Sequence, residues 1–161
     1  LTSLVSETLK NNIANYLSNY RMLNDYVVVG AARVIDLAFS IDLILEKNAN
    51  EGEIVTNVIT KVSEYFSVDK MELGEDLALG SLRAFIMTQP GVLNLTDILV
   101  FNKVGGNYSQ AVTTQPYVNA TTKQIGLLDD TIYAQPNEIL QIRFPDQDIA
   151  VRYKKPSKPV L

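Results

Sequence analysis

The sequence predicts an α+β fold with an N-terminal helix, long strands packed against two helices, and a C-terminal β-hairpin. Three patterns predict it: residues 3–21 repeat apolar side chains at helical spacing, residues 35–45 alternate at strand spacing, and residues 51–66 return to the helical period. Of the 161 residues, 47% are hydrophobic and 20% are charged. This balance is that of a folded domain and excludes a wholly disordered chain.

The first expected helix spans residues 3–21, and Ser3 or Ser6 is its expected N-cap. Its apolar stripe recurs at spacings of three and four: Leu4, Val5, Leu9, Ile13, Tyr16, Leu17 and Tyr20. Residues 1–24 are therefore expected to form a helical connector, followed by an α+β domain over residues 25–154. Because the first residue is Leu rather than Met, we expect the chain to be a piece of a longer protein.

The strongest pattern lies between residues 35 and 45. Every odd position there is apolar: Ile35, Leu37, Phe39, Ile41, Leu43 and Leu45. Such alternation predicts a long strand with one buried face and one largely wet face. Asp36 and Asp42 occupy the second face, roughly 20 Å apart on a strand, which is too far for one acid–base pair. We expect both to be solvated acids that point outward.

A second helix is expected over residues 51–66, with Glu51 and Glu53 in its first turn, where the helix dipole favours them. Its apolar residues are expected to pack against the odd face of the preceding strand, through Ile54, Val58, Ile59 and Val62.

A short helix is expected over residues 82–88, with Ser81 as its N-cap, and a tight turn at Pro90-Gly91 ends it. A second strand is expected over residues 92–103. Four apolar residues of this strand are expected to share one face, with Asp97 as an exception: Leu93, Leu95, Leu99 and Phe101.

Residues 105–128 are rich in Thr, Gln and Asn, and we expect a loop excursion with short extended pieces. A strand carrying Ile139, Ile142 and Phe144, a turn at residues 145–148 and a strand over residues 149–153 predict the C-terminal β-hairpin.

The last ten residues are basic, and no acid stands beside their four cations: Arg152, Lys154, Lys155 and Lys158. Pro156 and Pro159 favour an exposed tail over residues 155–161. The tail either docks onto an acidic partner or simply keeps the terminus soluble.

The missing residue types exclude several classes of chemistry. Without Cys there is no disulfide, no thiolate nucleophile and no Cys-based metal site. Without His, a Ser-His-Asp or Cys-His catalytic group cannot be assembled within the chain. The net charge of -4 argues against a general nucleic-acid surface. No apolar run reaches the length needed to span a bilayer, and we expect no cofactor and no metal.

Two motifs are superficial. Gly74, Gly80 and Ser81 resemble a phosphate loop, but the spacing is too long and no Lys precedes the Ser. Ser67 and Lys70 match the Ser-x-x-Lys pattern of penicillin-binding hydrolases, whose other two sequence motifs are missing. A helix cap and a solvated Lys explain these residues better.

The stretch over residues 32–103 resembles the C-terminal part of the baseplate J-like family of contractile-tail phages. The shared pattern is an alternating strand, a helix, a Gly-containing acidic link, a Ser-Leu helix, and Gly-Val leading into a strand. Five residues carry the resemblance most specifically: Gly80, Ser81, Leu82, Gly91 and Val92. Residues 104–161 match only loosely.

The resemblance implies a structural virion protein rather than an enzyme. It implies that copies pair and join into a ring around the hub of the tail baseplate, that they bind other wedge subunits, and that the ring rearranges during tail contraction. It also implies assembly in the host cytoplasm, with no nucleic-acid or membrane partner.

Two surfaces are candidates for these contacts. The first helix presents a stripe formed by Leu9, Ile13, Leu17 and Tyr20, and the tail presents Lys154, Lys155 and Lys158. We expect the stripe to form a two-fold dimer, because the other helices and the strands already close the core.

Two alternatives stay open. A small ligand- or nucleic-acid-binding β module would bind through the hairpin and the basic tail, and its binding would weaken steeply with salt. A carboxylate-dependent hydrolase would use Glu72, Glu75 and Asp76, which could also hold a hard cation.

Overall fold

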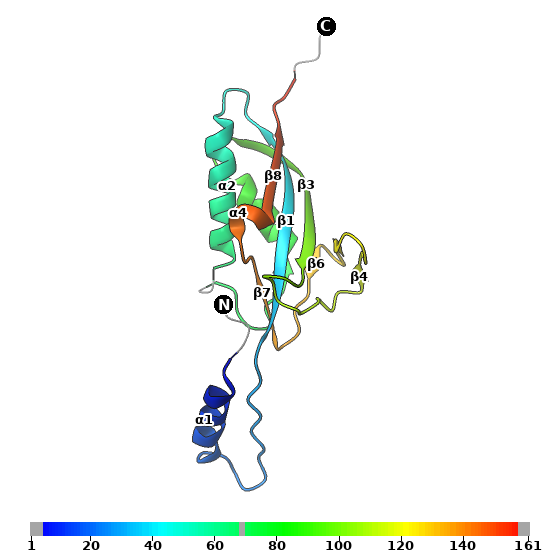
Figure 1. Ribbon diagram of the computed structural model, residues 1–161. Helices are drawn as coiled ribbons and strands as arrows, with labels where there is room; N and C mark the ends of the chain where they lie inside the picture. Colours follow the sequence, from blue (N-terminus) through cyan, green and yellow to red (C-terminus); the bar gives the residue numbers. More distant parts are fainter. Residues whose placement is uncertain (1–4, 68–69, 158–161) are drawn as a thin grey trace.

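The computed structural model of the chain describes residues 5–67 and 70–157. It confirms the predicted α+β class (Figure 1). In chain order the elements are α1 (Glu7–Ser18), β1 (Arg33–Leu45), α2 (Glu51–Tyr65), β2 (Leu77–Ala78), α3 (Leu79–Met87), β3 (Val92–Lys103), β4 (Tyr117–Val118), β5 (Ile125–Gly126), β6 (Thr131–Ile132), β7 (Glu138–Gln141), α4 (Pro145–Asp148) and β8 (Ile149–Lys154).

The main sheet is built around β1, which lies at its centre with a neighbour on each side (Figure 1). β3 pairs antiparallel with one edge of β1. On the other edge, β7 pairs in parallel with the beginning of β1, and β8 pairs in parallel with its later part. β7 and β8 are therefore successive segments along a single edge.

The predicted C-terminal hairpin is wrong, because β7 and β8 pair with β1 and not with each other. A single helical turn, α4, stands where a reversing turn was expected. The N–H groups of Gln147 and Asp148 donate to the carbonyl of Phe144, and the Asp148 carboxylate accepts from the Phe144 N–H at 2.9 Å. These bonds interrupt the strand and let the chain continue in the same direction.

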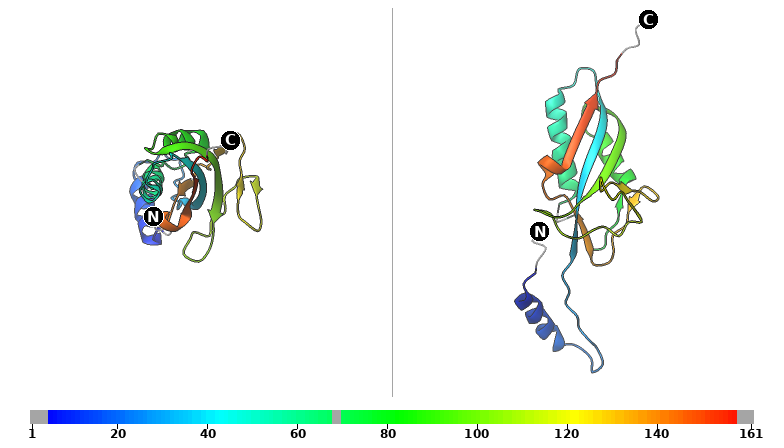
Figure 2. Two further views of the ribbon diagram at one scale, coloured as in Figure 1. Left: turned by 90° about the horizontal axis from the view of Figure 1, so that it is seen from above. Right: turned by 45° about the vertical axis from the view of Figure 1, so that its right-hand side comes forward.

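The hydrophobic core lies between the sheet and the two helices α2 and α3, which cover one of its faces (Figure 2). α2 buries Ile54, Val58 and Val62 against the odd positions of β1, as the sequence predicts. The rings of Phe39 and Phe66 lie 5.2 Å apart at this contact. Burying a large apolar side chain contributes on the order of 1.5–3 kcal/mol, so this contact adds substantially to the stability of the fold.

The buried face of β3 differs from the expected one because the strand contains a β-bulge. Leu95 pairs with Leu43 and Ile98 pairs with Ile41, so Thr96 is left over and the alternation changes parity. Beyond the bulge the even positions face the core. Leu99 and Phe101 lie on the opposite, half-exposed face, and Leu93 is exposed, so these residues do not share one buried face.

The helix α3 begins three residues earlier than expected, and Ser81 is not its N-cap. β2 pairs with β6, and the N–H of Leu79 donates to the carbonyl of Asp130 at 2.9 Å. Leu77 and Leu79 are fully buried. A distant segment therefore holds the start of this helix, in place of a local cap. Residues 105–128 form a loop in which β4 and β5 are the short extended pieces, as expected.

The helix α1 lies outside this body. It is shorter than the expected 3–21, and a chain segment without strand partners connects it to β1 (Figures 1 and 2). Among the residues that the structure describes, no helix combines the length and the apolar character required to cross a bilayer.

Candidate functional site

The most exposed apolar surface of the protein is its N-terminal arm, residues 5–32. Ser6 caps α1, accepting a hydrogen bond from the N–H of Leu9 at 3.2 Å, and Glu7 lies in the first turn. α1 contains no buried residue. Local signals therefore favour this helix, and its apolar stripe is left at least partly exposed.

The structure brings the four predicted stripe residues together on one side of α1. Their exposed fractions lie between 39% and 73%: Leu9, Ile13, Leu17 and Tyr20. The rings of Tyr16 and Tyr20 lie 5.3 Å apart and extend the stripe towards the end of the helix.

A turn reverses the chain after α1. The Asp25 N–H donates to the carbonyl of Met22, and its carboxylate accepts from the Met22 N–H. Residues 26–32 then run back in an extended conformation beside the helix towards β1 (Figure 2). This segment is not part of the surface that was predicted from the sequence. The sequence feature that could have identified the segment is the β-prone run Tyr26–Val29.

The large exposed apolar side chains are concentrated in the arm. Ten of its large apolar side chains are exposed: Val5, Leu9, Ile13, Tyr16, Leu17, Tyr20, Met22, Leu23, Tyr26 and Val28. The other exposed apolar side chains are distributed over several elements of the body. Such a concentration of exposed apolar side chains marks a site of contact with another molecule.

The second predicted surface, the basic tail, is partly engaged within the chain. Arg152 lies in β8 and forms a bidentate ion pair with Asp42, at 2.7 and 3.1 Å. Arg152 therefore has no acidic neighbour in the sequence but has one in the fold. The reason is tertiary, because β8 lies beside β1 and places the two side chains opposite each other.

Lys155 extends this pattern, since its Nζ lies 2.9 Å from the Glu51 carboxylate and also donates to the Ala49 carbonyl. Hydrogen bonds from Lys155 and then from the Tyr153 hydroxyl hold the pKa of Glu51 below its ordinary value. Lys154 is exposed, and Lys158 lies outside the described residues.

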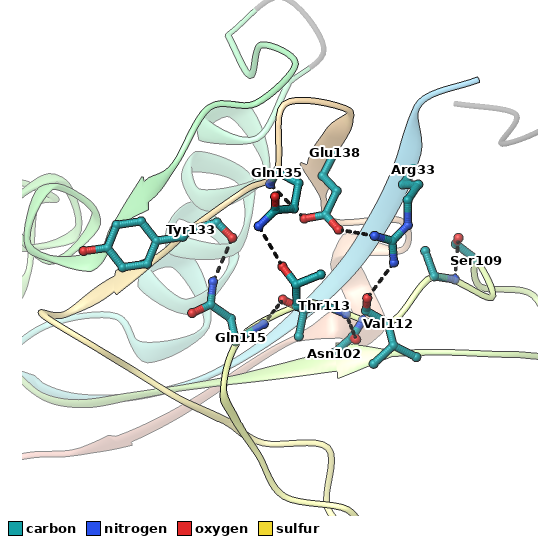
Figure 3. Close-up of polar contacts among 11 residues, drawn as sticks. Arg33, Asn102, Ser109, Val112, Thr113, Gln115, Tyr133, Gln135 and Glu138 are labelled. Atoms are coloured by element: carbon teal, nitrogen blue, oxygen red, sulfur yellow. Dashed lines mark hydrogen bonds and ion pairs between the residues drawn. The ribbon is translucent and has the colours of Figure 1, made fainter. Parts of the chain in front are cut away.

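A buried polar network joins the excursion at residues 109–115 to the sheet (Figure 3). The fully buried carboxylate of Glu138 accepts from Arg33 at 2.7 Å and from the Gln135 N–H at 3.0 Å. Arg33 also donates to the carbonyl of Val112. Arg33 thus joins the start of β1 to β7 and to the excursion.

The same network continues through side-chain amides (Figure 3). Asn102 accepts from the Thr113 N–H at 2.9 Å, and Gln115 donates to the carbonyl of Tyr133 at 2.7 Å. Oε1 of Gln115 has no hydrogen-bond partner in the part of the chain that the structure describes. The network's bonds attach loops to the sheet, which is a structural role.

Asp36 is fully buried, so the expectation of a solvated acid is wrong for this residue. Its carboxylate accepts from the Ser109 N–H and from Gln141, each at 2.6 Å. The excursion covers this part of the second sheet face, which alternation along β1 could not predict. Asp42 is partly exposed and ion-paired with Arg152.

The acidic residues weighed as a hydrolase or cation site are exposed and used locally. Glu75 accepts from the Glu72 N–H at 2.8 Å, and Asp76 accepts from the Ala134 N–H at 2.7 Å. Within residues 5–67 and 70–157, no group of three or more Asp or Glu side chains is arranged to hold a metal ion.

Comparison with known proteins adds no assignment. No model of a known protein family matches the chain, and no curated protein sequence matches it. The arm remains the candidate functional site of the chain.

Proposed function

We propose that this chain is a structural assembly domain of a phage tail baseplate wedge, and that its copies pair through the apolar arm. The observation that carries the proposal is the contrast between a closed core and an arm whose apolar side chains are exposed. The resemblance over residues 32–103 supports the baseplate assignment, and this stretch is similar to the large wedge subunit of T-even phages.

The arm is large enough for this role. Its ten exposed apolar side chains present on the order of 1,000 Å² of surface, and a standard interface buries about 800 Å² per partner. A two-fold dimer uses the same patch twice, so one arm per copy suffices. Further contacts with other wedge subunits would then close the ring around the hub.

The arm is a better contact than the basic tail. Arg152 and Lys155 are already paired with carboxylates of the body, so binding an acidic partner would first have to break those pairs. Among the described residues, no ion pair joins the arm to the body, so binding through the arm has no such cost.

Light scattering at micromolar concentration tests the pairing. The chain should be a dimer in both low and high salt, because apolar contacts are not screened. Ile13→Asp and Leu17→Asp should each give a monomer with an unchanged circular dichroism spectrum. Asn11→Asp introduces the same charge on the opposite side of α1 and should leave the dimer intact.

Other outcomes would contradict this assignment. A monomer under both conditions would exclude pairing through the arm. A dimer that dissociates only in high salt would move the contact to Lys154 and its neighbours. Loss of folding in Ile13→Asp would mean that α1 belongs to the core.

The baseplate assignment has a separate test. Gold-labelled antibodies against the chain should label the baseplate end of contractile-tailed particles made from the genome that encodes it. Labelling of the head or of the tail tube would exclude a wedge role.

A further inference from the structure

The segment between the arm's turn and β1, residues 26–32, has the properties of a β-strand but has no strand partner among the described residues. It begins with Tyr-Val-Val-Val, residue types that favour strands, and it continues directly into β1. Exposure alternates along it: Tyr26 and Val28 are 87% and 78% exposed, whereas Val27 and Val29 are half-buried. This is the period of a strand with one face covered.

The backbone of this segment is unpaired. Within the described residues, no hydrogen bond joins the N–H or carbonyl groups of residues 26–32 to another part of the chain. Unpaired extended backbone beside apolar side chains is a template for adding another strand. The strand signal and the free backbone together indicate that the partner strand comes from outside this copy.

The edge strands of the body that the structure describes are partly occupied or carry charges. The N–H of Asn102 in β3 donates to Lys123, which occupies part of that outer edge, and the carbonyl of Glu138 in β7 accepts from Gly74. The edge of β8 carries Arg152 and Lys154, and charged edge residues discourage strand addition.

A second copy of the arm fits better. The arm carries two acids and two bases, Glu7, Asp25, Lys10 and Arg21, so it is neutral and does not repel itself. No charged residue lies between positions 26 and 32. A two-fold axis perpendicular to the segment would place the same residues of two copies side by side and antiparallel.

We propose that residues 26–32 of two copies pair as an antiparallel two-stranded ribbon about this axis. The inference rests on the proposed pairing through the arm and names the backbone that performs it. The ribbon continues the two β1 strands, so it joins the two sheets through main-chain hydrogen bonds. The helices α1 then add the apolar contacts.

Single cysteines test the ribbon directly, because the chain contains no Cys. Cysteine is introduced at each position from Tyr26 to Gly30 in turn, and the cross-linked fraction is measured under mild oxidation. Directly opposed strand residues have Cα atoms about 4.5–5.5 Å apart, within disulfide range. One position, the residue on the axis, should cross-link far more than its neighbours. Uniform or absent cross-linking in a chain that still dimerises would overturn the ribbon.

A matched pair of substitutions separates backbone from side-chain contacts. Val27→Pro and Val28→Pro keep an apolar side chain but remove the N–H, and one of the two N–H groups must point at the partner. The proline variant whose missing N–H would point at the partner should dimerise about tenfold more weakly or worse, because each change occurs twice per dimer. Val27→Thr and Val28→Thr keep the N–H and the strand preference, and should remain within about threefold of the parent chain.

The outcomes distinguish the two proposals. If the parent chain is a monomer, both fail. If Ile13→Asp breaks the dimer but neither proline variant weakens it, the ribbon is wrong and pairing through α1 stands. If the threonine variants are as weak as the proline variants, side chains rather than backbone make the contact, and the ribbon is again wrong.

Discussion

Gln141 donates a hydrogen bond of 2.6 Å to the carboxylate of Asp36, although the two residues are 105 positions apart in the sequence. They are also register partners in the parallel pairing of β7 with β1. The Ser109 N–H donates to the second oxygen of the same carboxylate. One buried acid thus joins the central strand, the edge strand and the loop excursion.

The contact predicts a large cost for removing the carboxylate. Asp36→Ala would leave two buried donors unsatisfied, at about 1–3 kcal/mol each, and should lower the urea midpoint clearly. Asp42→Ala is the matched control on the same strand face, since it removes a partly exposed ion pair with Arg152 and should cost at most about 1 kcal/mol. Equal effects of the two substitutions would mean that Asp36 is not buried.

The core packing predicts a second difference. Leu37 is fully buried in β1, so Leu37→Ala should reduce the free energy of unfolding by ~2–5 kcal/mol. Leu93→Ala deletes the same atoms from an exposed position of β3 and should change it by less than about 0.5 kcal/mol. Denaturant unfolding of the two variants compares them directly, and an unchanged midpoint for Leu37→Ala would contradict the assignment of the core.

Two glycines should respond to alanine with opposite signs. Gly91 has a φ of +81°, and a Cβ there would fall on the side chain of Ile54, so Gly91→Ala should destabilise by more than about 1 kcal/mol. Gly52 lies in α2, where a Cβ would make only an ordinary contact of 3.9 Å with Oδ1 of Asn50, and Gly52→Ala should stabilise by up to about 1 kcal/mol. Thermal unfolding measures both, and a stabilised Gly91→Ala would show that the turn before β3 is formed differently.

Tyr108 predicts a loss of stability at alkaline pH. Its hydroxyl donates to Asp148 at 2.7 Å, and this hydrogen bond, with burial and the Asp148 charge, raises the pKa of Tyr108 from 10.0 to about 12. Because the pKa is higher in the folded state, the contribution is complete below pH ~10, the pKa of an unfolded tyrosine, and is lost as the pH rises towards the folded value.

The measurement is the difference in unfolding free energy between the parent chain and Tyr108→Phe. This difference should be constant below pH ~10 and should shrink steadily above it. A difference that grows with pH in this range would mean that Asp148 does not stabilise the protonated phenol.

Only part of the exposed surface of the arm could be predicted from the local sequence pattern. The spacing of Leu9, Ile13, Leu17 and Tyr20 predicted a stripe on one helix side, and the structure leaves that stripe exposed. Tyr26 and Val28 were not predicted to be part of this surface, because an apolar run before a strand is equally typical of a buried core segment. Only the unpaired backbone distinguishes it.

The sequence by itself determined the elements that depend on near neighbours. The apolar period of α2 and the Pro90-Gly91 turn before β3 predicted both elements to within a residue at each end, because these signals lie within the segment or next to it. The pairing partners of the strands could not be predicted in this way. β7 and β8 have strand character, but their pairing with β1 in place of each other depends on α4 carrying the chain forward. Three further features came from the tertiary structure alone: the burial of Asp36, the parity change at Thr96 and the pairing of Arg152 with Asp42. Each of them joins segments that are far apart in the chain. Local periodicity contains no information about which distant segment will lie beside a given strand.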